Sequence, residues 1–136
     1  MDQRAPVPGP VVFVVDDDPA VRRALAFSLD LEGFAVETFE SGEALMRRER
    51  PAAPGCLVLD ERLPGASGID TLRQLRAQAI DLPAILVTSH PNAPLRAAAE
   101  RAGAPILEKP LMGDTLVTTI RQLLAETVRP DASAPQ

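Results

Sequence analysis

Residues 11–19 of this chain read VVFVVDDDP, an uninterrupted apolar run that ends in three acids and a proline. Its five apolar residues, four of them β-branched, predict a strand buried on both faces, as in a parallel sheet. Three carboxylates follow directly, and acidic groups at the end of a buried strand need partners, which one divalent cation would supply to several at once. The stretch therefore predicts a metal-dependent acidic site at the carboxyl edge of an α/β sheet.

Further apolar runs alternate with segments of helical periodicity along the chain. The pattern predicts strands at 11–15, 34–39, 56–59, 83–87 and 105–107, and helices at 19–32, 41–50, 69–79, 95–102 and 116–124. Strands and helices in alternation imply parallel βαβ units with right-handed crossovers. The predicted fold class is α/β: a single doubly wound (βα)5 domain with a five-stranded parallel sheet in the order 2-1-3-4-5.

The predicted domain spans residues 11–127, between a flexible lead-in at 1–10 and a disordered tail at 128–136. The composition of the 136-residue chain, 46% hydrophobic and 24% charged, is ordinary for a soluble globular protein. A net charge of −5 argues against a surface that binds nucleic acid. Neither a membrane-spanning segment nor a signal peptide is recognisable, and the single cysteine, Cys56, fits a cytoplasmic location.

Side chains capable of chemistry fall where the predicted strands end. Asp16 and Asp17 end the first strand, Asp60 the third, Thr88 the fourth and Lys109 the fifth. The carboxyl ends of parallel strands meet at one edge, and neighbouring strands lie about 4.8 Å apart, so the three aspartates should meet. Mg²⁺ suits such a cluster, and a hydroxyl and an ammonium opposite it could hold the oxygens of a phosphoryl group carried by Asp60.

This combination of motifs resembles the response-regulator receiver domain of the CheY-like superfamily, and most closely its FixJ-type branch. The motifs are Asp-Asp after the first strand, Asp-x-x-x-Pro-Gly-x-x-Gly at 60–68, Thr88 after the fourth strand, and Lys109-Pro110 after the fifth. The resemblance implies that Asp60 accepts a phosphoryl group from a phosphohistidine. It also implies that Mg²⁺, or Mn²⁺ in its place, is held by Asp16, Asp17, Asp60 and the backbone carbonyl of Arg62.

The same resemblance assigns Thr88 and position 106 to the conformational switch, Lys109 to the phosphate counter-charge, and a cis peptide bond to Lys109-Pro110. Receivers of this kind usually carry an aromatic residue where Ile106 stands, so this chain has no ring to reorient at that position. The chain also departs from the family's pattern at Glu61, directly after Asp60, where an apolar residue is common. Two side chains near the site, Arg62 and His90, are expected to modulate the phosphorylation kinetics.

The resemblance implies a two-component signalling switch, not an enzyme, with self-phosphorylation and slow autodephosphorylation as its only reactions. Expected partners are a sensor histidine kinase or a histidine phosphotransfer protein. Output is expected through the face of the fourth helix, fifth strand and fifth helix, where a homodimer could form, without nucleic acid or membrane as a partner. Two alternatives stay open: the receiver of a truncated DNA-binding response regulator, and an aspartyl-phosphate-type phosphatase, which would favour an Asp-x-Asp pair on the first strand.

Overall fold

The structure, a computed structural model, describes residues 10–49, 55–111 and 113–128. Most of the predicted lead-in, residues 51–54 of a Pro/Ala-rich turn predicted at 51–55, and the predicted tail beyond 128 lie outside the described residues. Val128, where the tail was predicted to start, is the last residue of a helix.

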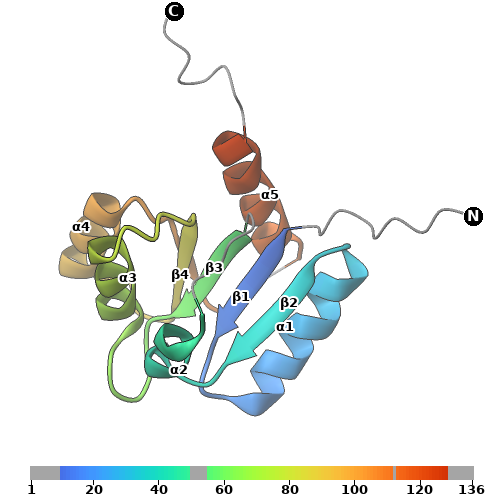
Figure 1. Cartoon of the computed structure of the whole chain (residues 1–136), viewed down its shortest axis with the longest axis horizontal. Coiled ribbons are helices and arrows are strands. Elements are labelled where there is room, and N and C mark those ends of the chain that lie inside the picture. Colours follow the sequence, from blue (N-terminus) through green and yellow to red (C-terminus); the bar gives the residue numbers. More distant parts are fainter. Residues whose placement is uncertain (1–9, 50–54, 112, 129–136) are drawn as a thin grey trace, which may run out of the picture.

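A parallel five-stranded sheet forms the centre of the molecule (Figure 1). Its strands are β1 (Val11–Val15), β2 (Ala35–Phe39), β3 (Gly55–Asp60), β4 (Ala84–Thr88) and β5 (Ile106–Glu108). Their order is β2-β1-β3-β4-β5, and every neighbouring pair is parallel. The predicted fold class and strand order are therefore confirmed, and all carboxyl ends of the strands lie at one edge.

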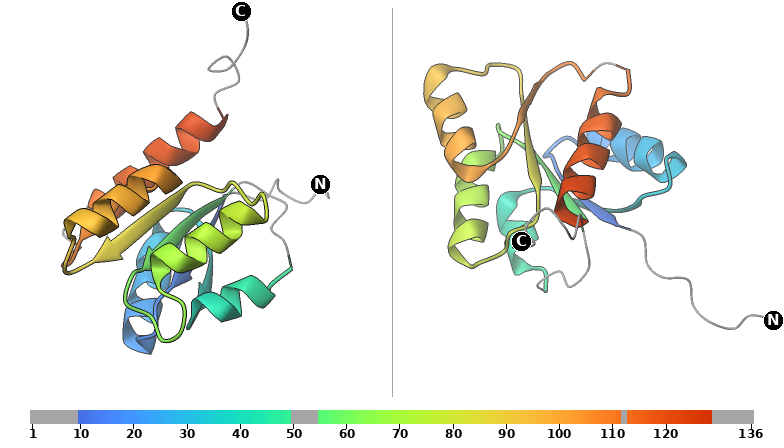
Figure 2. Two further views of the ribbon diagram at one scale, coloured as in Figure 1. Left: turned by 90° about the vertical axis from the view of Figure 1, so that its left-hand side faces the viewer. Right: turned by 90° about the horizontal axis from the view of Figure 1, so that it is seen from above.

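Five helices cover the two faces of this sheet (Figure 2). They are α1 (Pro19–Leu31), α2 (Gly42–Arg47), α3 (Gly68–Ala77), α4 (Ala93–Ala102) and α5 (Thr115–Val128). Val12 and Val14 of β1 pack toward α1 and α5, whereas Phe13 and Val15 pack toward α2, α3 and α4. Both faces of β1 are thus buried, which is why its sequence is apolar without alternation.

The helix boundaries follow local capping chemistry. Asp18 accepts a hydrogen bond from the backbone N–H of Ala20 at 2.9 Å, with Pro19 as the first helical residue of α1. Helix α4 begins two residues earlier than its apolar spacing predicts, because the Asn92 side chain accepts from the N–H of Leu95. It ends as predicted at Gly103, whose φ of 75° is the left-handed conformation that glycine adopts readily.

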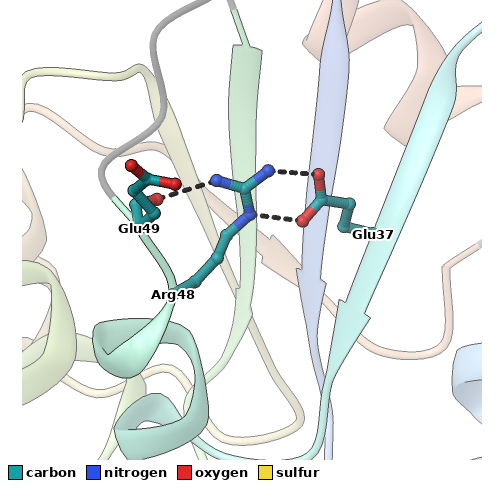
Figure 3. A network of polar contacts seen from close by, with 3 residues as sticks. All are labelled: Glu37, Arg48 and Glu49. Atoms are coloured by element: carbon teal, nitrogen blue, oxygen red, sulfur yellow. Dashed lines mark hydrogen bonds and ion pairs between the residues drawn. The ribbon is translucent and has the colours of Figure 1, made fainter.

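Helix α2 ends at Arg47, so the predicted extension of this helix to residue 50 is wrong. The next residue, Arg48, has an extended backbone, and its guanidinium donates to both carboxylate oxygens of Glu37 on β2 and to the carbonyl of Glu49 (Figure 3). Its guanidinium carbon also lies 5.5 Å from the ring centroid of Phe13. These contacts draw Arg48 toward the sheet and stop the helix.

Candidate functional site

Three aspartates meet at the carboxyl edge of the sheet. Asp16 and Asp17 follow β1, Asp60 ends β3, and one carboxylate oxygen from each lies within 4.8 Å of the others. The pairing of β1 with β3 aligns Val15 with Leu59, so the next residue on each strand falls side by side. Asp16 and Asp60 are buried, with 5% of each exposed, while Asp17 faces solvent. The structure thus brings together three negative groups, two of them out of water.

Asp16 is held by hydrogen bonds at each of its polar groups. Its N–H donates to the carbonyl of Phe39 at 3.1 Å, and its carboxylate accepts from the N–H of Asp18 at 2.9 Å. Its carbonyl accepts from Nη1 of Arg22 at 2.6 Å. Sequence reasoning missed Arg22, although its place one turn into the helix that follows the aspartates puts a long donor within reach of them.

Burial raises the pKa of Asp16 above its usual value, and the negative charges of Asp60 and Asp17 raise it further. The N–H of Asp18 and the ammonium of Lys109 act in the opposite direction but do not cancel the rise. The cluster is therefore electrostatically unfavourable by itself. A bound cation would relieve this cost, and three carboxylates are donors of the kind that Mg²⁺ binds, so the residues present fit a divalent metal.

Lys109 supplies the one positive charge in direct contact with a carboxylate of the cluster within the described part of the chain. Its Nζ lies 3.1 Å from Oδ1 of Asp60, and its backbone N–H donates to the carbonyl of Thr88 at 2.9 Å. The backbone contact ties the end of β5 to the end of β4. The Lys109-Pro110 peptide bond is cis, as the resemblance implied.

Thr88 and Ile106 lie on the face of the sheet that α4 covers. Thr88 is buried, and its hydroxyl accepts from the N–H of His90 at 3.2 Å. Ile106 pairs with Leu86 of β4 and packs, half-buried, against the core of that face. The two predicted switch residues thus lie on the same side of the sheet, each next to Leu86. Within the described residues, they do not line a common cavity.

A cavity of about 810 Å³ opens above the aspartates. Seven residues that the sequence analysis singled out line it: Asp16, Asp17, Asp60, Arg62, Thr88, His90 and Lys109. Arg62 and His90 are exposed at its edge, so both side chains are free to meet a solvent molecule or a partner. Ile106 does not line it.

Glu61, directly after Asp60, turns toward the start of α3. Its N–H donates to the carbonyl of Val87 at 2.9 Å, its carbonyl accepts from the N–H of Gly68 at 3.1 Å, and its carboxylate accepts from the N–H of Ile69 at 2.8 Å. Burial raises the pKa of this half-buried carboxyl group. The sequence alone left the direction of this side chain undecided. Glu61 thus binds an N–H group in the first turn of α3, whose N-cap is Ser67, and fixes the backbone next to Asp60.

Gly68 packs directly against the backbone of Asp60 and Glu61, and a side chain at this position would have no room. A Cβ at this position would lie 2.6 Å from the carbonyl oxygen of Asp60 and 3.0 Å from Cα of Glu61. Both neighbours are backbone atoms, which cannot rotate away as a side chain could. The last glycine of the 60–68 motif is therefore required by packing against the strand that carries Asp60.

A doubly wound parallel sheet with aspartates and a lysine at its carboxyl edge defines a receiver of the CheY-like class. The chain belongs to the response regulator receiver domain family, whose sequence model matches residues 12–121. Receiver domains of this family act in two-component systems and interact with sensor histidine kinases. Phosphorylation and magnesium binding are typical of the family, and its members are generally not true enzymes.

Regulators from several bacteria are similar in sequence. The C4-dicarboxylate transport regulator DctD of Pseudomonas aeruginosa is 43% identical over 114 residues, which are 83% of this chain and 25% of DctD. FixJ of Bradyrhizobium diazoefficiens is 36% identical over 116 residues, 85% of this chain and 57% of FixJ. The chain therefore spans between a quarter and three fifths of the length of these curated relatives.

Solved structures of response regulators superpose closely. The response regulator StyR gives a TM-score of 0.80 at 42% identity over 86% of this chain and 60% of StyR. The isolated FixJ-N domain gives 0.76 at 36% identity over 88% of this chain and 96% of that domain. Within the described residues, no helix combines the length and the apolar character needed to cross a bilayer.

Proposed function

We propose that this chain is a phosphorylation-dependent switch in which Asp60 accepts a phosphoryl group from the phosphohistidine of a sensor kinase or phosphotransfer protein. One observation carries the proposal: three carboxylate oxygens within 4.8 Å of one another, with Nζ of Lys109 3.1 Å from Asp60. Such a cluster is costly unless it serves a cation and an incoming anion together.

The metal would be Mg²⁺, or Mn²⁺ in its place, held by Asp16, Asp17, Asp60 and the backbone carbonyl of Arg62. All of these donors are oxygens, which both ions accept. When bound, the ion neutralises the carboxylates and binds phosphoryl oxygens. The hydrogen bonds to Arg22, Phe39 and Asp18 support this assignment, because they hold Asp16 in place without the help of a cation.

In the transfer step, a carboxylate oxygen of Asp60 attacks phosphorus while the phosphorus–nitrogen bond of the phosphohistidine breaks. The electron pair of that bond leaves with the imidazole nitrogen. Lys109 and the hydroxyl of Thr88 would donate hydrogen bonds to the transferred phosphoryl oxygens. Arg62 and His90, exposed at the edge of the cavity, would control the access of water to the acyl phosphate and hence the rate of autodephosphorylation.

Output would follow from movement of the residues that meet the phosphoryl group. Phosphorylation adds a charge of about −1.5 to −2. Because the N–H of Lys109 is bonded to the carbonyl of Thr88, a shift of either residue moves the ends of β4 and β5 together. The affected face is formed by α4, β5 and α5, and it would contact a partner protein or a second copy of this chain.

The phosphorylation proposal is tested by intact-mass spectrometry after incubation with acetyl phosphate. We expect one phosphoryl adduct with MgCl₂, none with EDTA, and none in Asp60→Asn. Asp70→Asn, which removes an exposed carboxylate of α3, is the matched control and should be labelled normally. Labelling of Asp60→Asn, or labelling that persists without a divalent ion, would refute the proposal.

The switch is tested separately, by NMR spectra recorded with and without beryllofluoride, a phosphoryl mimic. Chemical-shift changes at Thr88, Ile106 and along α4 would support output through this face. If the changes stop at the aspartates and Lys109, then the aliphatic Ile106 does not couple the site to that face, and output must take another route.

A further inference from the structure

Four arginines gather on two neighbouring helices of a protein that is otherwise acidic. Helices α3 and α4 lie side by side on one face of the sheet (Figures 1 and 2). Together they carry Arg73, Arg76, Arg96 and Arg101 against two acids, Asp70 and Glu100, a net charge of +2. The whole chain has a net charge of −5, so the remainder carries −7. Because the two helices are separate in sequence, no basic stripe is visible before folding.

Three of these arginines border one groove between the helices. This groove, of about 290 Å³, is lined by Arg73, Arg76 and Arg101, with Ala98 and Ala102 between them. Arg73 and Arg76 stand one turn apart on α3, and Arg101 lies in the last turn of α4. The alanines are small, so the guanidinium groups flank a space that a partner's side chains can enter.

The arginines of the groove form few ion pairs with acidic residues of the same chain. Arg101 makes neither a hydrogen bond nor an ion pair through its side chain within the described residues. Arg73 has one contact, at 3.6 Å to Oδ1 of Asp70, and both side chains are more than half exposed, so this pair is weak. An incoming carboxylate would therefore compete easily for both arginines.

Arg76 is half-buried at the floor of the groove. It donates to the carbonyls of Ile80 at 3.0 Å, Leu82 at 2.7 Å and Ala102 at 3.4 Å, but to no carboxylate. These bonds use Nη1 and Nε, which leaves the Nη2 donors without a partner among the described residues. The charge of Asp81 acts on this half-buried cation, but its hydrogen bonds within the described residues all go to carbonyl oxygens, so it gains from a further negative charge nearby.

We propose that the α3–α4 groove docks an acidic segment of a partner protein, with two or more carboxylates one helical turn apart. Such spacing matches the one-turn separation of Arg73 and Arg76, and Arg101 on the facing helix completes the pairing. The groove also adjoins the cavity above the aspartates, since Arg73 and Ala98 line both. A docked segment would therefore lie next to the cavity above the aspartates, which is the phosphorylation site if the proposed function holds.

A protein segment fits this surface better than a nucleic acid. The positive region is one groove wide, and charges farther away than the Debye length of about 8 Å at physiological salt are largely screened. A nucleic acid carries a phosphate roughly every 3.4 Å along each strand, so it would extend onto the acidic remainder of the molecule. Asp70 and Glu100, on the two helices themselves, would also face it.

The proposal is tested on the full chain with a fluorescein-labelled peptide of about 15 residues, long enough to form helix, carrying glutamates one turn apart. A peptide with glutamine at those positions and a single-stranded oligothymidylate serve as comparisons. Fluorescence anisotropy gives the affinities, and amide chemical shifts locate the contact. Arg73→Gln and Arg101→Gln are the test variants, whereas Arg96→Gln on the same helix, outside the groove, is the matched control.

We expect the glutamate peptide to bind, the glutamine peptide not to bind, and the shifts to map to α3 and α4. Loss of one exposed ion pair should weaken binding about two- to fivefold in Arg73→Gln and in Arg101→Gln, with Arg96→Gln unchanged. Tighter binding of the oligothymidylate, an equal loss in Arg96→Gln, shifts outside these helices, or no binding of the glutamate peptide would each overturn the proposal.

Discussion

Replacing Asp16 by asparagine should stabilise the metal-free protein. Asparagine keeps an oxygen that can accept from the N–H of Asp18 but removes one of the clustered negative charges. Two unit charges 4.8 Å apart repel by about 3 kcal/mol at an effective dielectric constant near 20, and by about 1 kcal/mol in water. Asp17 is adjacent to Asp16 in the unfolded chain as well, so the repulsion gained on folding comes mainly from Asp60.

The ammonium of Lys109 offsets part of that repulsion, so we expect Asp16→Asn to raise the free energy of unfolding by about 1–2 kcal/mol in EDTA near neutral pH. The chain has neither tryptophan nor tyrosine, and urea unfolding is therefore followed by far-ultraviolet circular dichroism. Asp18→Asn is the control. It retains an equally good helix cap and should change the stability by less than about 0.5 kcal/mol.

The pH dependence gives an independent check of the same reasoning. The folded-state pKa of Asp16 is raised above its ordinary 3.8, so ionisation of this group opposes folding. The free-energy cost of ionising Asp16 in the folded state is complete above the folded-state pKa and falls as the pH drops through that pKa. It is absent below the unfolded-state pKa, where the carboxyl group is protonated in both states. The gain in free energy of unfolding of Asp16→Asn over the wild type must therefore shrink at acidic pH.

Magnesium should reduce or reverse the stability difference between the wild type and Asp16→Asn. Ligand that binds only the folded state stabilises it by mass action, so MgCl₂ should stabilise the wild type more than Asp16→Asn. The electrostatic reasoning fails if Asp16→Asn is no more stable than the wild type in EDTA at neutral pH. It fails equally if the gain is undiminished in acid.

Three further perturbations probe contacts around the site. Arg22→Met removes the donor to the Asp16 carbonyl and should weaken Mg²⁺ binding, measured by calorimetry, about tenfold. Arg23→Met is the control and should leave the affinity unchanged. Equal Mg²⁺ affinities of Arg22→Met and the wild type would exclude a positioning role for Arg22. Gly68→Ala should cost about 1–3 kcal/mol in urea unfolding because its Cβ meets backbone, and an unchanged midpoint would contradict this. Arg48→Met should cost about 0.5–1 kcal/mol, since its pair is partly exposed, and a larger loss would show that the ion pair is underestimated.

The strand pattern was sufficient to predict the fold because the three central strands, β1, β3 and β4, are buried on both faces. A run such as residues 11–15 has no solvent-facing position, so its apolar residues identify it without tertiary information. The strand ends then place Asp16, Asp60 and Lys109 at one edge, whatever the loops between them do. Caps such as Asp18 were likewise predictable, because their hydrogen bonds are local.

The contacts that the sequence did not predict join residues that lie at no regular spacing along the chain. The bond from Arg22 to the Asp16 carbonyl requires the angle between α1 and the sheet. The early end of α2 depends on Glu37, eleven residues before Arg48. The groove of Arg73 and Arg101 exists only because α3 and α4 lie side by side. Each case depends on tertiary geometry, which helical and strand periods do not encode.

The bonds that Glu61 makes to the N–H groups of Gly68 and Ile69 join the two ends of the loop between β3 and α3. The position of Asp60 is therefore set by this junction and not by the residues between the joined ends. Foreign sequence inserted between Leu63 and Ser67 should leave the acidic cluster in register. The loop is accordingly a place where new recognition elements can be grafted beside Asp60 without rebuilding the domain.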